Sequence, residues 1–158
     1  MFKLFESPSF NDPVLGPFKR ARRLWRGTLV LAGTSLPLSI AGTRGAPDAE
    51  ALAIARLLPA TWSSNRELVA RALIEHLEPY REAIAADETD RPDRPLPFIE
   101  RTADVWQFVA LLSASVTPLN GKLIAEIALA ATWDEEHTLG ARFEGPVFVE
   151  LNGSIVPE

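Results

Sequence analysis

The segment Trp133-Asp134-Glu135-Glu136-His137-Thr138-Leu139-Gly140 gathers three carboxylates and one imidazole at consecutive positions. Such oxygen and nitrogen atoms can hold a divalent cation, and a Glu/His pair can carry out general acid–base catalysis. However, successive side chains of an extended segment point in different directions, and no second histidine follows at a ligand spacing such as His-Glu-x-x-His. A third interpretation is an exposed acidic recognition turn, in which Asp134 makes a local backbone hydrogen bond and His137 packs or bonds within the turn. All three interpretations stay open, and the spacing favours recognition, with Trp133 as its anchor on an apolar face.

Other signs of catalysis are absent from the sequence. The chain contains no cysteine, which excludes disulfides, thiolate metal sites and cysteine nucleophiles. Gly-x-Ser-x-Gly and the glycine-rich phosphate-binding loops are also missing. His76, the only other histidine, falls beside the apolar face of an expected helix, which is typical of a hydrogen-bonded histidine at the edge of a core. We therefore expect no catalytic residue and no cofactor, and a binding protein rather than an enzyme. The alternative is a metal-binding or small-ligand-binding domain, with hydrolase activity as one form of it, that uses the Asp134-His137 turn.

The run from Lys19 to Arg26 is strongly basic and could bind phosphates, with Trp25 stacking on a base. The sequence pI of about 5.1 argues against a nucleic-acid partner and favours an edge strand whose charges discourage edge-to-edge pairing. Residues 1–26 hold six basic and two acidic side chains, a net charge of +4, so the remaining 132 residues carry −9 of the total of −5. This acidic remainder predicts a basic protein partner, with Asp134, Glu135 and Glu136 among the contacts.

The elements that must position these residues are of two kinds. Short strands are expected over 18–26, 27–31 and 36–41, followed by a helix that begins at Pro47-Asp48 and ends near Leu58, before Pro59. A second helix is expected from Ser64, where Glu67 completes a capping box, to about residue 84. An exposed loop rich in charges and proline is expected over about 86–97.

The last third of the sequence predicts an antiparallel meander. Asn120-Gly121 lies between two apolar runs, which indicates a hairpin because both turn residues need positive φ. Strands are expected over 108–119, 122–133, 139–144 and 147–151. The predicted fold class is therefore α+β, with N-terminal short strands, two central helices and a C-terminal antiparallel meander, the helices packing on one sheet.

Composition sets the expected size and location. At 158 residues and 47% apolar composition, we expect a single domain over 1–158. The N-terminus lacks the pattern of a signal peptide, and the apolar stretch 28–41 is too short and too interrupted to cross a bilayer. Together with the missing cysteines, these features predict a cytoplasmic protein without membrane contacts.

Two pairs of segments also carry a resemblance. They are Asp12-Pro13-Val14-Leu15-Gly16 with Trp25-Arg26-Gly27, and Leu119-Asn120-Gly121-Lys122 with Trp133-Asp134-Glu135-Glu136-His137-Thr138-Leu139-Gly140. The pattern resembles a group of small uncharacterised bacterial domains in which an opening Asp-Pro-Val-Leu-Gly hairpin, central helices and a closing Trp-Asp-Glu-Glu-His hairpin recur. Some of these domains look similar to the immunity proteins that neutralise secreted bacterial toxins. The resemblance implies protein binding as the function, and no catalytic residues come with it.

Overall fold

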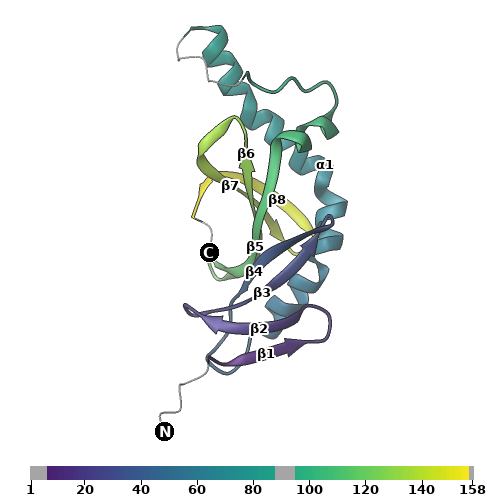
Figure 1. Cartoon of the computed structure of the whole chain (residues 1–158), viewed down its shortest axis with the longest axis vertical. Coiled ribbons are helices and arrows are strands. Elements are labelled where there is room, and N and C mark those ends of the chain that lie inside the picture. The colour runs from purple at the N-terminus through teal and green to yellow at the C-terminus, as the bar shows by residue number, and fades with distance from the viewer. Residues whose placement is uncertain (1–6, 88–94, 157–158) are drawn as a thin grey trace.

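An eight-stranded mixed sheet with one long helix on one face forms the fold (Figure 1). The computed structural model describes residues 7–87 and 95–156. The strands follow one another across the sheet in chain order, and every neighbouring pair is antiparallel except β4 and β5. The elements are β1 (Ser9–Asp12), β2 (Gly16–Ala21), β3 (Leu24–Leu31), β4 (Thr34–Ile40), α1 (Ala49–Ala85), the 3-10 helix η1 (Thr102–Phe108), β5 (Val109–Leu119), β6 (Lys122–Ala131), β7 (Asp134–Glu144) and β8 (Val147–Ile155).

The parallel β4–β5 pair explains the place of α1. Parallel neighbours cannot be joined by a tight hairpin and need a crossover, which α1 and η1 provide. In Figure 1 α1 runs along most of the long axis, with β1–β4 at one end of the molecule and β5–β8 beside the rest of the helix. The predicted α+β class and the antiparallel C-terminal meander are confirmed.

Two adjacent rows of paired residues show how the sheet separates its core from its surface. One row of cross-strand partners is almost entirely apolar and consists of Arg20, Trp25, Ile40, Val116, Ala125, Phe143 and Phe148. The next row is entirely polar and consists of Lys19, Arg26, Ser39, Ser115, Glu126, Arg142 and Glu150. Because side chains alternate between the two faces of a strand, the apolar row belongs to the core and the polar row crosses the opposite face.

The prediction of two central helices is wrong, because α1 is a single helix of 37 residues with Pro59 and Pro79 inside it. It begins where the sequence predicts, with Asp48 as N-cap accepting a hydrogen bond from the Ala51 backbone N–H. A proline removes one backbone hydrogen bond and crowds the preceding turn. The buried stripe on both sides of Pro59 outweighs that cost and holds the helix together, with Leu52, Ala55, Leu58, Trp62, Val69, Leu73 and Leu77 all buried. The Ser64 capping box therefore does not form, since Ser64 lies in the helix interior.

The prediction of one strand over 18–26 is also wrong. The chain reverses at Arg22-Arg23, which connect β2 to β3 as a two-residue hairpin turn. Both arginines have positive φ, 53° and 68°, as a type I′ turn requires. The predicted Asn120-Gly121 turn is confirmed, with φ values of 53° and 81° between β5 and β6. The 3-10 helix η1 was not predicted, and residues 88–94 of the expected 86–97 loop lie outside the described residues.

Buried polar contacts attach the two ends of the sheet to α1. The Asp12 carboxylate accepts hydrogen bonds from the backbone N–H groups of Val14 and Leu15 and pairs with Arg56 of α1. At the other end, the Asn65 amide donates to the Pro146 carbonyl and accepts from the Phe148 N–H, so it covers the edge of β8. Within the described ranges, no helix has the length and apolar character needed to span a membrane.

Candidate functional site

A wide bulge in β7 displays the segment that the sequence singles out. Leu139 pairs with Leu129 and Asp134 pairs with Ala131, so the four residues 135–138 lie opposite Ala130 alone. A bulge breaks the regular pairing and redirects the side chains of its extra residues. The acidic segment is therefore pushed out of the regular ladder beside the Thr132-Trp133 turn.

The buried carboxylate of Asp134 holds the bulge in shape. Its Oδ1 atom accepts a hydrogen bond from the backbone N–H of His137 at 3.2 Å and contacts His137 Nδ1 at 2.9 Å. The predicted local hydrogen bond of Asp134 is thus confirmed. Burial alone would raise the pKa of Asp134, but the neighbouring Tyr80 hydroxyl and His137 outweigh burial and lower it. Asp134 is therefore an ionised internal brace, and the prediction that it lies in an exposed turn is wrong because its side chain is only 4% exposed.

Helix α1 contacts the buried side of the bulge through His76 and Tyr80. The Trp133 indole N–H donates to His76 Nδ1 at 3.0 Å, and His76 Nε2 lies 3.7 Å from Asp134 Oδ2. Burial lowers the pKa of His76, the nearby Asp134 opposes this effect and His137 adds to it. Burial together with the charges of Asp134 and Glu136 raises the pKa of Tyr80 to about 12. His76 is thus a satisfied core-edge histidine, as predicted, and acts here as the hydrogen-bond acceptor for Trp133.

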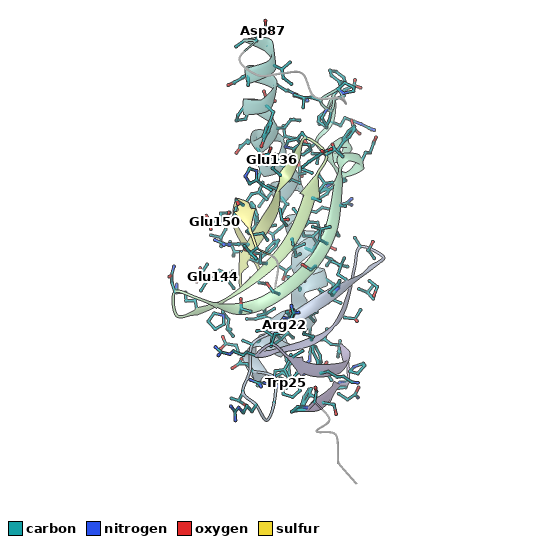
Figure 2. All side chains as sticks on the ribbon, turned by 60° about the vertical axis from the view of Figure 1, so that its left-hand side comes forward. Arg22, Trp25, Asp87, Glu136, Glu144 and Glu150 are labelled. Atoms are coloured by element: carbon teal, nitrogen blue, oxygen red, sulfur yellow. The ribbon has the colours of Figure 1, made fainter. Side chains whose placement is uncertain are left out.

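The remaining residues of the segment face solvent. Glu135, Glu136 and His137 are exposed, whereas Trp133 is only 7% exposed. Figure 2 shows Glu136 together with Glu144 and Glu150 in the part of the molecule formed by β5–β8. The structure therefore divides the five predicted site residues into two internal supports, Trp133 and Asp134, and three exposed side chains.

The geometry gives limited scope for metal binding or catalysis. Among the residues that the structure describes, no group of three or more His, Asp or Glu side chains is placed to hold a metal ion. Asp134 orients His137 through Nδ1, as an acid–base residue would be oriented. Within 7–87 and 95–156, neither histidine is hydrogen-bonded to a serine or threonine hydroxyl.

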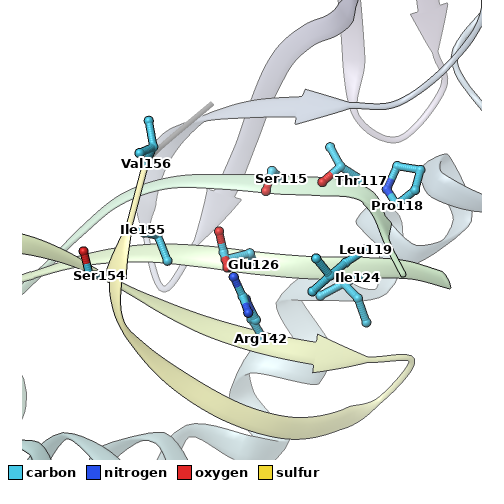
Figure 3. A pocket seen from close by; sticks show the side chains of 10 residues that line it. All are labelled: Ser115, Thr117, Pro118, Leu119, Ile124, Glu126, Arg142, Ser154, Ile155 and Val156. Atoms are coloured by element: carbon cyan, nitrogen blue, oxygen red, sulfur yellow. The ribbon is translucent and has the colours of Figure 1, made fainter. Parts of the chain in front are cut away.

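A second polar feature lies on the sheet face opposite the core row. A depression of about 330 Å³ there is lined by residues of β5–β8 and by Val156 (Figure 3). On its floor, Arg142 Nε donates to Glu126 Oε2 at 2.6 Å and a second nitrogen donates to Glu150 at 3.0 Å. These two carboxylates raise the pKa of Arg142, against the effect of burial. Because two carboxylates flank the single guanidinium, the cation of Arg142 is already paired and the three ionised groups together carry a charge of −1.

Sequence reasoning missed Tyr80 and the contact between His76 and Trp133. His76 and Tyr80 are four residues apart on α1, a spacing that places them on one face of a helix and was available as a signal. The contact of His76 with Trp133, which lies 57 residues away in the chain, depends on how α1 crosses the sheet. Local pattern cannot supply that information.

Fold and site together define an α+β protein whose eight-stranded sheet presents an exposed, internally braced acidic bulge. The chain belongs to the family described as Domain of unknown function (DUF6985), whose model matches residues 15–154. No curated protein and no solved structure matches the chain.

Proposed function

We propose that the protein is a non-catalytic, cytoplasmic protein-binding module that contacts a basic partner through Glu135, Glu136 and His137. Its role is that of a bacterial immunity protein, which neutralises a toxin by binding it. The observation that carries the proposal is that the bulge combines buried, hydrogen-bonded residues with exposed charged ones. Asp134 and Trp133 are buried and hydrogen-bonded, so that the three exposed side chains project from a fixed backbone.

Preorganisation explains why such a bulge suits recognition. Ordering a loop on binding costs free energy, and a segment already held by hydrogen bonds avoids most of that cost. The His137 N–H bond to Asp134 and the Trp133 bond to His76 fix both ends of the exposed segment before any partner arrives. Binding energy can then come from the exposed carboxylates themselves.

Charge distribution supports a basic partner. The described residues after position 48 hold fourteen acidic and seven basic side chains, a net charge of −7. No ion pair with another described residue engages Glu135 or Glu136, so both carboxylates are available within that part of the chain. An acidic surface of this kind accelerates encounter with a basic protein and selects against acidic ones.

Co-purification tests the proposal. The tagged protein is co-expressed with the product of each neighbouring reading frame, and the double variant Glu135→Gln/Glu136→Gln is run in parallel. We expect the wild-type chain to retain one basic neighbour and the double variant to retain much less of it. The matched control Glu75→Gln/Glu82→Gln removes two exposed acids of α1 and should bind as the wild type does.

The outcomes separate recognition from cation binding. A thermal-shift scan of the same proteins with divalent cations should show no change for the isolated wild-type chain. A shift equivalent to about 2.7 kcal/mol at 100 times the dissociation constant, lost in the double variant, would establish a cation site in place of the protein interface. Failure of every neighbouring product to bind would count against the immunity role.

A further inference from the structure

The β2–β3 hairpin carries five basic residues, Lys19, Arg20, Arg22, Arg23 and Arg26, and is called the basic hairpin from here on. Lys19 and Arg26 are direct cross-strand partners and belong to the polar row of the sheet. Like charges placed directly opposite each other destabilise a strand pair. The hairpin thus keeps a repulsive pair at a position where one acidic residue would remove the repulsion.

The cations of the basic hairpin differ from the described basic residues after position 48. None of the five has an ion pair with a described residue. Six of the seven described basic residues after position 48 do have one, namely Arg56, Arg71, Arg81, Arg101, Lys122 and Arg142. The seventh, Arg66, lies over the Trp106 ring at 5.2 Å. Arg44 also has no ion pair with a described residue, so five of the six described basic residues without an ion pair or an aromatic contact lie on this hairpin.

The turn of the basic hairpin has a strained backbone, which other residue types at the same two positions would relieve. Arg22 and Arg23 both adopt the left-handed conformation, at φ 53° and 68°. Non-glycine side chains crowd the backbone in this region, and Asn-Gly is the pair that fits it best. The same chain uses Asn120-Gly121 in the equivalent turn between β5 and β6. Strain that persists where a better pair exists points to a role for the two side chains.

Two arginines of the basic hairpin, Arg26 and Arg20, differ in their hydrogen bonds. Arg26 is held by Ser39 Oγ at 3.0 Å and by the Ala21 carbonyl at 3.4 Å. Arg20 belongs to the row of the core face, and its buried Nε atom has no hydrogen-bond partner among the described residues.

We propose that the basic hairpin is a second interaction surface, which binds an acidic segment of another protein through guanidinium–carboxylate pairs. A guanidinium group can donate two parallel hydrogen bonds to one carboxylate. The hairpin is positively charged, whereas the bulge is negatively charged, so the two surfaces select partners of opposite charge. Nucleic acid fits less well, because Trp25 is fully buried with its N–H bonded to the Thr43 carbonyl and so cannot stack on a base.

Fluorescence anisotropy with a labelled decaglutamate peptide tests this surface on the full chain at low and at physiological ionic strength. The informative variant is Arg22→Asn/Arg23→Gly, which removes two charges and installs the preferred turn residues. We expect its Tm to rise by about 2–4 °C, because strain is relieved, and its affinity for the peptide to fall about tenfold. A loss of binding in a more stable protein cannot be attributed to misfolding.

Two further variants complete the test. Arg71→Gln/Lys122→Gln removes two basic residues outside the hairpin that are already ion-paired within the chain. Its affinity for the peptide should stay within about twofold of that of the wild type, and its stability should change little, because exposed ion pairs contribute little to the free energy of unfolding. Arg22→Lys/Arg23→Lys keeps the charge but removes two guanidinium forks, so its affinity for the peptide should lie between those of the wild type and Arg22→Asn/Arg23→Gly. The proposal is overturned if the wild type does not bind the peptide at low salt or if both charge-removing variants lose affinity equally. Tighter binding of a single-stranded oligonucleotide, or salt-sensitive self-association of the wild type that the turn variant abolishes, would overturn it in favour of those partners.

Discussion

The basic hairpin and the acidic bulge of β7 differ in where their charged residues find partners. In the bulge, Asp134 is buried and bonded to His137, and only the neighbouring glutamates face solvent. In the basic hairpin, the cations have no carboxylate partner in the described part of the chain, and the turn that carries two of them is strained. Figure 2 places Arg22 of the hairpin in the part formed by β1–β4 and Glu136 in the part formed by β5–β8. One charged segment can therefore contain both residues that stabilise the fold and residues that are free to contact a partner. The burial of each side chain distinguishes the two roles.

The largest effect should come from removing the brace of the bulge. Asp134→Ala takes away the acceptor for the His137 N–H and leaves buried polar groups unpaired, so we expect a loss of about 2–4 kcal/mol in the free energy of unfolding. Urea denaturation measures this loss. Glu135→Gln/Glu136→Gln should stay within about 0.5 kcal/mol of the wild type, because both side chains are exposed. Equal destabilisation by the two changes would remove the distinction between brace and contact.

A slightly smaller effect is expected at the anchor of the N-terminal strands. Asp12→Ala breaks the pair with Arg56 and two backbone hydrogen bonds, which should cost about 2 kcal/mol. The hydrogen bond from Arg56 is the main reason that the pKa of Asp12 falls from 3.8 to about 2, against the opposing effect of burial. Its stabilisation is therefore complete above pH 3.8 and disappears as the pH falls toward 2. The difference in stability between wild type and variant should vanish over that interval in acid titrations followed by circular dichroism.

The support from α1 can be tested by a change that removes one hydrogen-bond donor. Trp133→Phe keeps an aromatic ring but deletes the indole N–H that donates to His76, and we expect it to cost about 1 kcal/mol. Chemical denaturation gives the stability, and binding of the basic partner gives the function. A variant as stable as the wild type would show that the Trp133–His76 bond does not fix the bulge.

The smallest effect should be a pH dependence near neutrality. Burial lowers the pKa of His76 below its ordinary value of 6.5, so the unfolded chain takes up a proton at a higher pH than the folded chain does. Stability should consequently decrease as the pH falls below 6.5, and a proton on Nδ1 would also displace the Trp133 N–H. His76→Gln should flatten this part of the stability profile between pH 7 and pH 5. An unchanged slope in the variant would assign the dependence to another group.

The sequence predicts those parts of the molecule in which local rules act alone. The Asn120-Gly121 turn, the Asp48 helix start and the local bond of Asp134 all depend on residues within four positions of one another. The helix through Pro59 could not be predicted from local rules, because its continuity depends on a stripe that is buried against a distant sheet. The stripe does keep its phase from Leu52 to Leu77, and that continuity was the available sign of one helix rather than two.

The candidate site divides in the same way. Acidic residues that adjoin a tryptophan are visible in the sequence, but burial separates Asp134 from Glu135 and Glu136, and it depends on the path of α1. The Arg22-Arg23 turn was hidden for a different reason. Arginine rarely adopts positive φ, so the residue types of Arg22-Arg23 do not indicate the turn that the two residues form between β2 and β3.

Protection in living cells tests the central claim most directly. Each neighbouring reading frame is induced in cells that also express the wild-type chain, the Glu135→Gln/Glu136→Gln variant or the Glu75→Gln/Glu82→Gln control, and growth is measured. We expect one neighbour to arrest growth, the wild-type chain and the control to restore it, and the bulge variant to fail although it folds with wild-type stability. Full protection by the bulge variant, or the absence of any neighbour that arrests growth, would contradict the account.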